Sequence, residues 1–133
     1  GDLISRVMGA YQRGEAGVAE ALMNIRQAAV DMRDALVNRD LRAVGKLLDF
    51  NWENQKRLYS EMTTPKIEAL FAIARPEGML GGKACGAGGG GCILLLCEPD
   101  SEHRVRRAVE DLGGTIIEFQ FDNSGLQVWT AQP

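Results

Sequence analysis

A glycine-rich segment in the second half of the chain holds the residues whose types and spacing could do chemistry. Seven of the 16 glycines lie between Gly81 and Gly91, and Lys83 stands among them. Since glycine has no side chain, the backbone N–H groups of such a segment can approach a ligand closely and point in one direction. The segment therefore predicts a loop that can hold an anion. The alternative is a tight connection between two strands, although ordering four consecutive glycines costs substantial conformational entropy.

Two familiar nucleotide-binding motifs do not fit this segment. The pattern G-x-G-x-x-G is present as Gly86, Gly88 and Gly91, but an apolar strand is expected after it, where a dinucleotide-binding fold requires a helix. A Walker loop is excluded because Ala84 follows Lys83, at the place of the Ser or Thr that binds magnesium. The candidate contacts to a substrate or phosphate are Lys83, Gly86, Ala87, Gly88, Gly89 and Gly90.

Two further candidates lie on a helix that is expected to follow Asp40. Asn51 interrupts an apolar stripe and could reach a sugar, and Lys56 could meet an anionic substrate. A solvated helix surface is the ordinary place for a lysine, so both interpretations of Lys56 stay open. Trp52 is expected to pack in the core or at a domain interface.

The cysteines and the single histidine predict neither a metal site nor a catalytic triad. Cys85, Cys92 and Cys97 lack the Cys-x-x-Cys spacing of zinc ligands, and His103 stands on a charged helix surface. The thiols are expected to be small buried packing groups. With one histidine, away from any candidate nucleophile, hydrolysis of the Ser-His-Asp type has no general base.

The elements that must position these residues change in type along the chain. Apolar residues recur every three or four positions in the first half, which predicts helices over Val18–Leu36 and Leu41–Leu58. Asp40 and Thr64 are expected as N-caps, the second before a helix that begins at Pro65. A short helix is also expected over Leu3–Tyr11.

The second half favours strands around one helix. The expected strands are Cys92–Cys97, Thr115–Phe121 and Leu126–Thr130, and the expected helix is Ser101–Leu112. The turn residues Asp122–Gly125 predict that the last two strands form an antiparallel hairpin. The predicted class is α+β, in a ferredoxin-like arrangement with helices on one face of a mainly antiparallel sheet.

Composition limits the classes of protein that remain. The chain has 133 residues, a formal net charge of −3 and 25% charged residues, which predicts one globular domain over 1–133 and argues against nucleic acid as a partner. The longest uncharged run, Ala84–Cys97, has 14 residues, whereas a membrane-spanning helix needs about 20. No secretory signal is visible, so a cytoplasmic location is expected. A start at Gly1 without Met suggests a fragment.

The glycine-rich segment closely resembles the third conserved motif of the GHMP kinases, and the resemblance extends along most of the chain. It is closest to the branch that contains the heptose-phosphate kinases and the galactokinase-like sugar kinases. A departure from the galactokinase pattern is Cys85, where a Thr commonly stands. The segments that carry the resemblance are Asn51–Lys56, Thr64–Glu68, Gly82–Cys92, Phe119–Asp122 and Gly125–Leu126.

The resemblance implies a two-domain enzyme that transfers the γ-phosphoryl group of ATP to a sugar or heptose phosphate. This chain resembles the C-terminal domain only, so ATP and Mg²⁺ would be bound mainly by an N-terminal domain against which it packs, and no catalytic residue is assigned here. One alternative is a kinase that acts on an unphosphorylated sugar. Another is a ferredoxin-like module that binds a metabolite without catalysis. The oligomeric state is left open.

Overall fold

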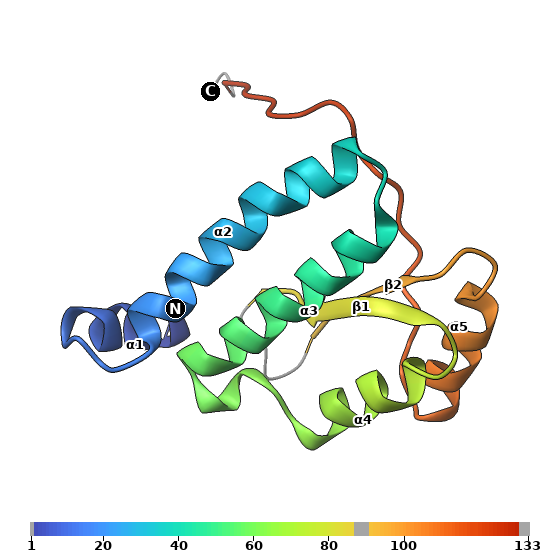
Figure 1. Cartoon of the computed structure of the whole chain (residues 1–133), viewed down its shortest axis with the longest axis horizontal. Coiled ribbons are helices and arrows are strands. Elements are labelled where there is room, and N and C mark those ends of the chain that lie inside the picture. The colour runs from blue at the N-terminus through green and yellow to red at the C-terminus, as the bar shows by residue number, and fades with distance from the viewer. Residues whose placement is uncertain (1, 87–90, 131–133) are drawn as a thin grey trace.

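The computed structural model describes residues 2–86 and 91–130. Five α-helices and a two-stranded antiparallel sheet occur in this part of the chain (Figure 1). They are α1 (Asp2–Gln12), α2 (Val18–Val37), α3 (Leu41–Leu58), α4 (Pro65–Ala74), β1 (Met79–Ala84), β2 (Ile93–Cys97) and α5 (Glu102–Asp111), with a short 3₁₀ helix at Ser60–Met62 before α4. The α+β class, with helices packed on an antiparallel sheet, is confirmed.

Local sequence signals start the two helices that follow tight connections. The side chain of Asp40 accepts a hydrogen bond from the backbone N–H of Ala43 at 2.9 Å, at the start of α3. The hydroxyl of Thr64 accepts one from the N–H of Ile67 at 3.2 Å, and Pro65 opens α4. Each cap satisfies a backbone donor that the helix itself leaves free. Both predicted caps are therefore confirmed.

Helix α3 organises the domain because it contacts α2 on one side and β1 on another. Figure 1 shows α2 and α3 side by side as an antiparallel pair, with β1 next to α3. A Cβ atom on Gly81 would lie 1.9 Å from the carbonyl oxygen of Gly45 on α3, which no side chain can tolerate. The two backbones therefore meet directly, and glycine at both positions permits the approach.

The main core lies between α3, α4, α5 and the sheet. Trp52 on α3 is only 3% exposed and stacks on Phe71 of α4, with ring centroids 6.1 Å apart. The predicted packing role of Trp52 is confirmed. A smaller cluster lies between α2 and α3, where Leu96 of β2 also packs. The buried members of the main core are Trp52, Met62, Ile67, Leu70, Phe71, Ala74, Met79, Ala84, Val105 and Val109.

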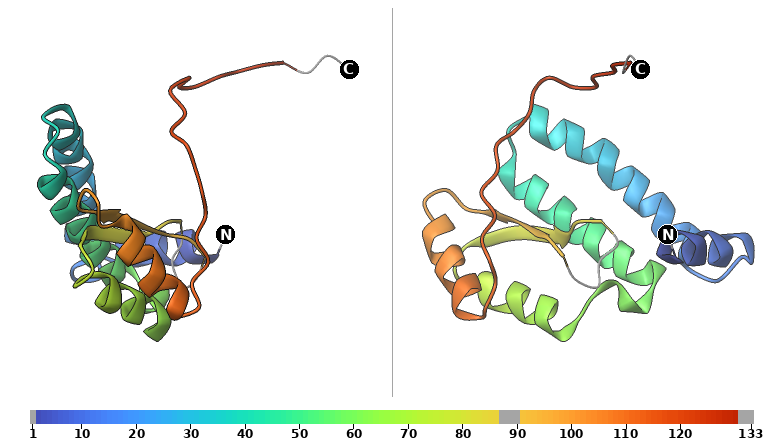
Figure 2. Two further views of the ribbon diagram at one scale, coloured as in Figure 1. Left: turned by 90° about the vertical axis from the view of Figure 1, so that its right-hand side faces the viewer. Right: turned by 180° about the vertical axis from the view of Figure 1, so that it is seen from behind.

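The two C-terminal strands predicted over 115–121 and 126–130 are not formed. These residues make no strand ladder, and Figure 2 shows them as a coil that leaves the end of α5 and extends away from the sheet. Phe121 and Leu126, for example, are 87% and 92% exposed. Alternating apolar residues form a strand only beside another strand that pairs with their backbone. Here the expected turn is partly present, because Asp122 accepts a hydrogen bond from the N–H of Ser124 at 2.7 Å, but the ladder is absent.

Within the described residues, no helix has both the length and the hydropathy that crossing a bilayer requires.

Candidate functional site

The glycine-rich segment connects β1 to β2 as a hairpin loop. Ala84 pairs with Ile93 in the sheet, and the N–H of Cys85 donates to the carbonyl oxygen of Cys92 at 2.9 Å, which closes the base of the loop. Gly86 and Gly91 stand just inside this closure and have positive φ angles of 71° and 83°. The candidates Ala87, Gly88, Gly89 and Gly90 lie outside the described residues.

Lys83 and Asn51, two of the predicted site residues, are in direct contact. The ammonium of Lys83 on β1 donates to Oδ1 of Asn51 on α3 at 2.8 Å, across 32 positions of sequence. Burial lowers the pKa of Lys83, and attraction to the nearby Cys85 partly opposes this. The structure therefore places a half-buried lysine, held by a neutral amide, two residues before the base of the loop.

Gln55 is a site residue that the sequence interpretation missed. It lies one helical turn after Asn51, and its Nε2 donates to the carbonyl oxygen of Gly86 at 3.0 Å. Its Oε1 is buried and has no hydrogen-bond donor among the described residues. Asn51 thus contacts the end of β1, and Gln55 contacts the adjoining loop base, from the same side of α3, as positions i and i+4 of a helix can. A polar residue within the apolar stripe of this helix was the available signal.

Lys56 is separated from this group. Its ammonium lies 2.8 Å from Glu53 and 3.4 Å from Glu68, and 5.8 Å from the ring centre of Trp52. Burial of Lys56 acts to lower its pKa, but hydrogen bonds and attraction from the two glutamates outweigh burial and raise it. The structure therefore does not bring Lys56 together with Lys83, and carboxylates already compensate its charge.

The cysteines are less buried than the sequence predicts. Cys85 and Cys92 are exposed free thiols, so the expectation of buried packing groups is wrong for these two. Both directly adjoin the last paired residues of the sheet, Ala84 and Ile93. Cys97 is partly buried, and burial raises the pKa of its thiol. In the described part of the chain, no three His, Cys, Asp or Glu side chains lie together as metal ligands would.

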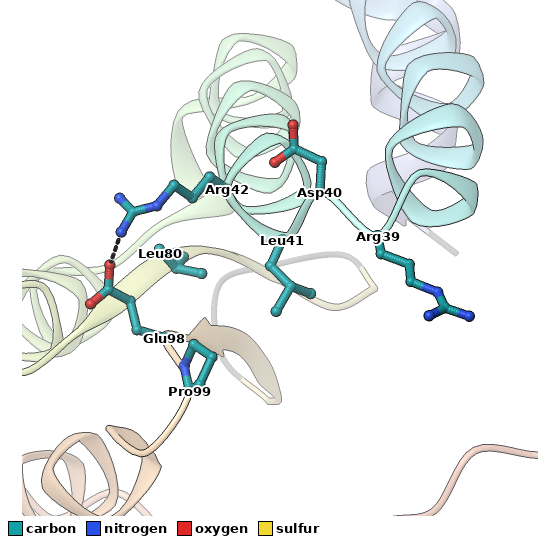
Figure 3. A pocket seen from close by; sticks show the side chains of 7 residues that line it. All are labelled: Arg39, Asp40, Leu41, Arg42, Leu80, Glu98 and Pro99. Atoms are coloured by element: carbon teal, nitrogen blue, oxygen red, sulfur yellow. Dashed lines mark hydrogen bonds and ion pairs between the residues drawn. The ribbon is translucent and has the colours of Figure 1, made fainter.

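An open pocket of about 350 Å³ lies at the opposite end of α3 from Gln55. Figure 3 shows Arg39, Asp40 and Arg42 on one side of it and Glu98 and Pro99 on the other, with Arg42 and Glu98 joined by an ion pair of 2.8 Å. None of its lining residues belongs to the loop base. The pocket and the candidate site are therefore two different regions of the surface.

Comparison with known proteins identifies related kinases. The chain is 26% identical over 116 residues to the D-glycero-alpha-D-manno-heptose 7-phosphate kinase of Campylobacter jejuni, covering 87% of this chain and 34% of that protein. It is 28% identical over 137 residues to the mevalonate kinase of Thermococcus onnurineus, covering 99% of this chain and 40% of the relative. A galactokinase of Haemophilus influenzae is 34% identical over 64% of the chain and 22% of its own length.

A solved structure shares the fold. The mevalonate kinase of L. major, in complex with R-mevalonate, superimposes with a TM-score of 0.72 at 21% identity, covering 83% of this chain and 33% of that one. The chain thus spans between a third and two fifths of the length of the heptose-phosphate and mevalonate kinases that it matches. The family model for the GHMP kinases C terminal matches residues 32–114. This match covers more than half of the chain, and the chain therefore belongs to the GHMP kinase C-terminal family.

Proposed function

We propose that this chain is the C-terminal domain of an ATP-dependent kinase that transfers the γ-phosphoryl group to a sugar or heptose phosphate. The observation that carries the proposal is the contact between Lys83 and Asn51 at the base of the glycine loop. The specific acceptor that we propose is a D-glycero-D-manno-heptose 7-phosphate, which agrees with the name of the Campylobacter jejuni relative.

The charge environment selects Lys83 as the main phosphate contact. An ammonium group has three N–H donors, and Lys83 uses one of them on the neutral amide of Asn51. No carboxylate forms a salt bridge with Lys83 among the described residues, whereas Lys56 has Glu53 and Glu68. A desolvated positive charge without a compensating carboxylate attracts phosphate more strongly than a compensated one. Lys56 is a secondary candidate on the substrate side.

The backbone of the loop supplies the second part of the proposed site. Gly86 is held to α3 by Gln55, and the remaining proposed contacts are Ala87, Gly88, Gly89 and Gly90. Phosphoryl transfer depends mostly on positioning the reactants and stabilising negative charge, which N–H groups and a lysine can do without covalent chemistry. The chain would therefore position and neutralise phosphate but supply no catalytic residue.

The cofactors belong mainly to an N-terminal domain in this proposal. The residues here that suit a phosphate of ATP are Lys83 and the loop backbone. The described residues offer no acidic cluster that suits Mg²⁺, so we assign the metal to the other domain, against which residues 1–133 would pack as a single unit. When bound, Mg²⁺ would compensate the charge of the transferred phosphoryl group. The proposed location is the cytoplasm.

Other acceptors have specific support. The mevalonate kinase of Thermococcus onnurineus matches 99% of the chain, which favours a small hydroxy acid as the second candidate. The galactokinase match favours an unphosphorylated sugar. The glycine loop would serve each of them, because it contacts phosphate rather than the distinguishing part of the acceptor.

An acceptor screen tests the proposal. The longer protein, in which this chain follows a GHMP kinase N-terminal domain, is incubated with ATP, Mg²⁺ and heptose 7-phosphate, galactose or mevalonate, and ADP release is measured. We expect the largest kcat/KM with the heptose 7-phosphate. A preference for mevalonate or galactose would overturn the assignment of a heptose phosphate as the acceptor. If no acceptor is phosphorylated, the kinase assignment is overturned in favour of a binding module.

A further inference from the structure

Two cysteines face each other across the base of the glycine loop. Ala84 and Ile93 are paired in the sheet, so Cys85 and Cys92 are the next opposing pair, and the N–H of Cys85 donates to the carbonyl oxygen of Cys92 at 2.9 Å. Cα atoms of such a hydrogen-bonded pair lie about 5.5 Å apart. Disulfides form at Cα separations of about 4.4–6.8 Å. The usual spacing of such a pair therefore falls within the range that a disulfide requires.

The side chains of this pair lie on the same face of the hairpin and are open to solvent. Directly opposing residues of an antiparallel pair project to one face, with Cβ atoms about 4.5–5.5 Å apart, and a disulfide needs about 3.5–4.5 Å. A small inward shift is therefore required. Gly86 and Gly91 flank the pair on its loop side, and a Cβ at either position would meet no atom of the described residues within 4 Å. The backbone freedom of these glycines permits this shift.

Lys83 provides a positive charge next to one of the two thiols. It lies two positions before Cys85 and therefore on the same face of the strand. Attraction between Cys85 and Lys83 acts to raise the pKa of the lysine against the effect of its burial. The thiolate is the form of a cysteine that reacts with oxidants, and Cys85 is exposed where an oxidant can reach it. Cys97, which is partly buried, has no cysteine opposite it, since its partner in the sheet is Met79.

We propose that Cys85 and Cys92 are a redox-active dithiol that closes reversibly to a disulfide across the base of the glycine loop, with a peroxide as oxidant. The thiolate of Cys85 attacks one oxygen of hydrogen peroxide, the O–O bond breaks, and a sulfenic acid forms, while the departing hydroxide takes the proton that the Cys85 thiol had released and becomes the first water. The thiolate of Cys92 then attacks the Cys85 sulfur, the S–S bond forms, and the departing hydroxide takes a proton to become the second water. The two sulfurs lose two electrons, and the two peroxide oxygens gain them.

The bond would join the two ends of the loop that holds the proposed phosphate contacts. Its effect on phosphoryl transfer rests on the proposed function, because it depends on the loop contacting phosphate. The formation of the bond does not rest on the proposed function, because it needs only the two thiols and the oxidant. The chemistry can therefore be measured on the chain without any substrate.

The test counts and locates thiols before and after oxidation. The 133-residue chain is treated with hydrogen peroxide, its free thiols are blocked with N-ethylmaleimide, and the protein is reduced and labelled with iodoacetamide. Trypsin leaves all three cysteines in the peptide Ala84–Arg104, whose fragment ions assign each label. We expect iodoacetamide on Cys85 and Cys92, N-ethylmaleimide on Cys97 and, before labelling, a monomeric intact mass lower by two hydrogen atoms. Dithiothreitol added before the N-ethylmaleimide should restore the mass and place N-ethylmaleimide on all three thiols.

Matched variants separate the pair from the third thiol. Cys97→Ser should leave oxidation unchanged, whereas Cys85→Ser and Cys92→Ser should each abolish the intramolecular bond while melting at the wild-type temperature. The proposed disulfide between Cys85 and Cys92 would be overturned if all three thiols stay reduced. It would also be overturned if the thiols form sulfinic acids, or if disulfides form only between molecules. A disulfide that forms in the longer protein without changing its kinase activity would support the dithiol and count against the role of the loop in the proposed function.

Discussion

The carboxylate of Asp49 on α3 accepts a hydrogen bond from the backbone N–H of Gly82 on β1, with 3.0 Å between Oδ1 and N. The same carboxylate pairs with both terminal nitrogens of Arg75, at 2.9 and 3.1 Å. Arg75 in turn donates to the carbonyl oxygen of Leu80 at 3.2 Å. Among the described residues, no strand pairs with this edge of β1. Side chains satisfy two of its backbone groups, the N–H of Gly82 and the carbonyl oxygen of Leu80, and so help to protect the edge from pairing with other chains. Lys83 follows Gly82 directly, and its ammonium is hydrogen-bonded to Asn51 on α3.

Asp49→Ala should therefore destabilise the domain by about 1–3 kcal/mol, because it leaves the Gly82 N–H and the Arg75 guanidinium without their acceptor. Urea denaturation of the chain measures the loss. Asp34→Ala is the control, since Asp34 pairs with its neighbour Arg33 on the exposed surface of α2, and we expect a change within about 0.5 kcal/mol. Equal losses in both variants would show that Asp49 does not support β1.

The direct contact between α3 and β1 gives a second prediction. Gly81→Ala should destabilise the chain by about 3 kcal/mol or more, because the new Cβ would lie 1.9 Å from a backbone oxygen that cannot move without shifting α3. Gly9→Ala on α1 is the control, where the Cβ meets only the flexible end of Arg13, and alanine should stabilise the helix slightly. The urea concentrations at the midpoints of unfolding of the two variants and the wild type measure these changes in stability. A Gly81→Ala variant as stable as the wild type would contradict the close packing of helix and strand.

Lys83 predicts a pH dependence of stability. Burial of the ammonium lowers its folded-state pKa below the ordinary 10.5, and attraction to Cys85 offsets only part of this. Between the two values the unfolded chain binds more protons than the folded one, so the free energy of unfolding rises with pH in that interval. The wild type should thus gain stability relative to Lys83→Met as pH approaches 10.5. Urea denaturation of the wild type and of Lys83→Met at several pH values up to 10.5 measures the difference in their free energies of unfolding. A difference that stays constant, or that falls as pH rises, would contradict the burial of the charge.

The chain alone should not turn over ATP, because the proposed nucleotide and magnesium sites belong mainly to another domain. Incubation of the purified chain with ATP, Mg²⁺ and the acceptor panel should release no ADP above background, while circular dichroism shows the helices to be intact. Turnover that survives further purification would show that the chain itself contains a complete active site.

Local signals account for what the sequence predicts correctly. Asp40 and Thr64 bond within their own first helical turns, so neighbouring residues suffice to place these helix starts. The burial of Trp52 follows from a helical stripe with one apolar side. The glycine-rich segment could be placed before a strand because an apolar run of strand length follows it. The strand that precedes it, β1, contains two glycines and a lysine and has no such run.

What the sequence missed depends on contacts between distant segments. Gln55 meets Gly86 across 31 positions, and nothing in the spacing of either residue shows that α3 passes the loop base. Cys85 and Cys92 are exposed beside a sheet that has two strands among the described residues, where more strands were expected. The residues at 115–130 have the alternation of strands, but alternation does not supply the neighbour that a strand requires.

The most direct measurement compares Lys83→Ala with Lys46→Ala in the longer kinase. Lys46 is an exposed lysine on the same helix as Asn51 and lies outside the proposed site. A charge-assisted hydrogen bond to phosphate is worth about 1.5–3 kcal/mol, so kcat/KM for a heptose 7-phosphate should fall roughly ten- to a hundredfold in Lys83→Ala and stay at the wild-type value in Lys46→Ala. Equal kcat/KM in Lys83→Ala and the wild type would contradict the assignment of Lys83 and the glycine loop to phosphate.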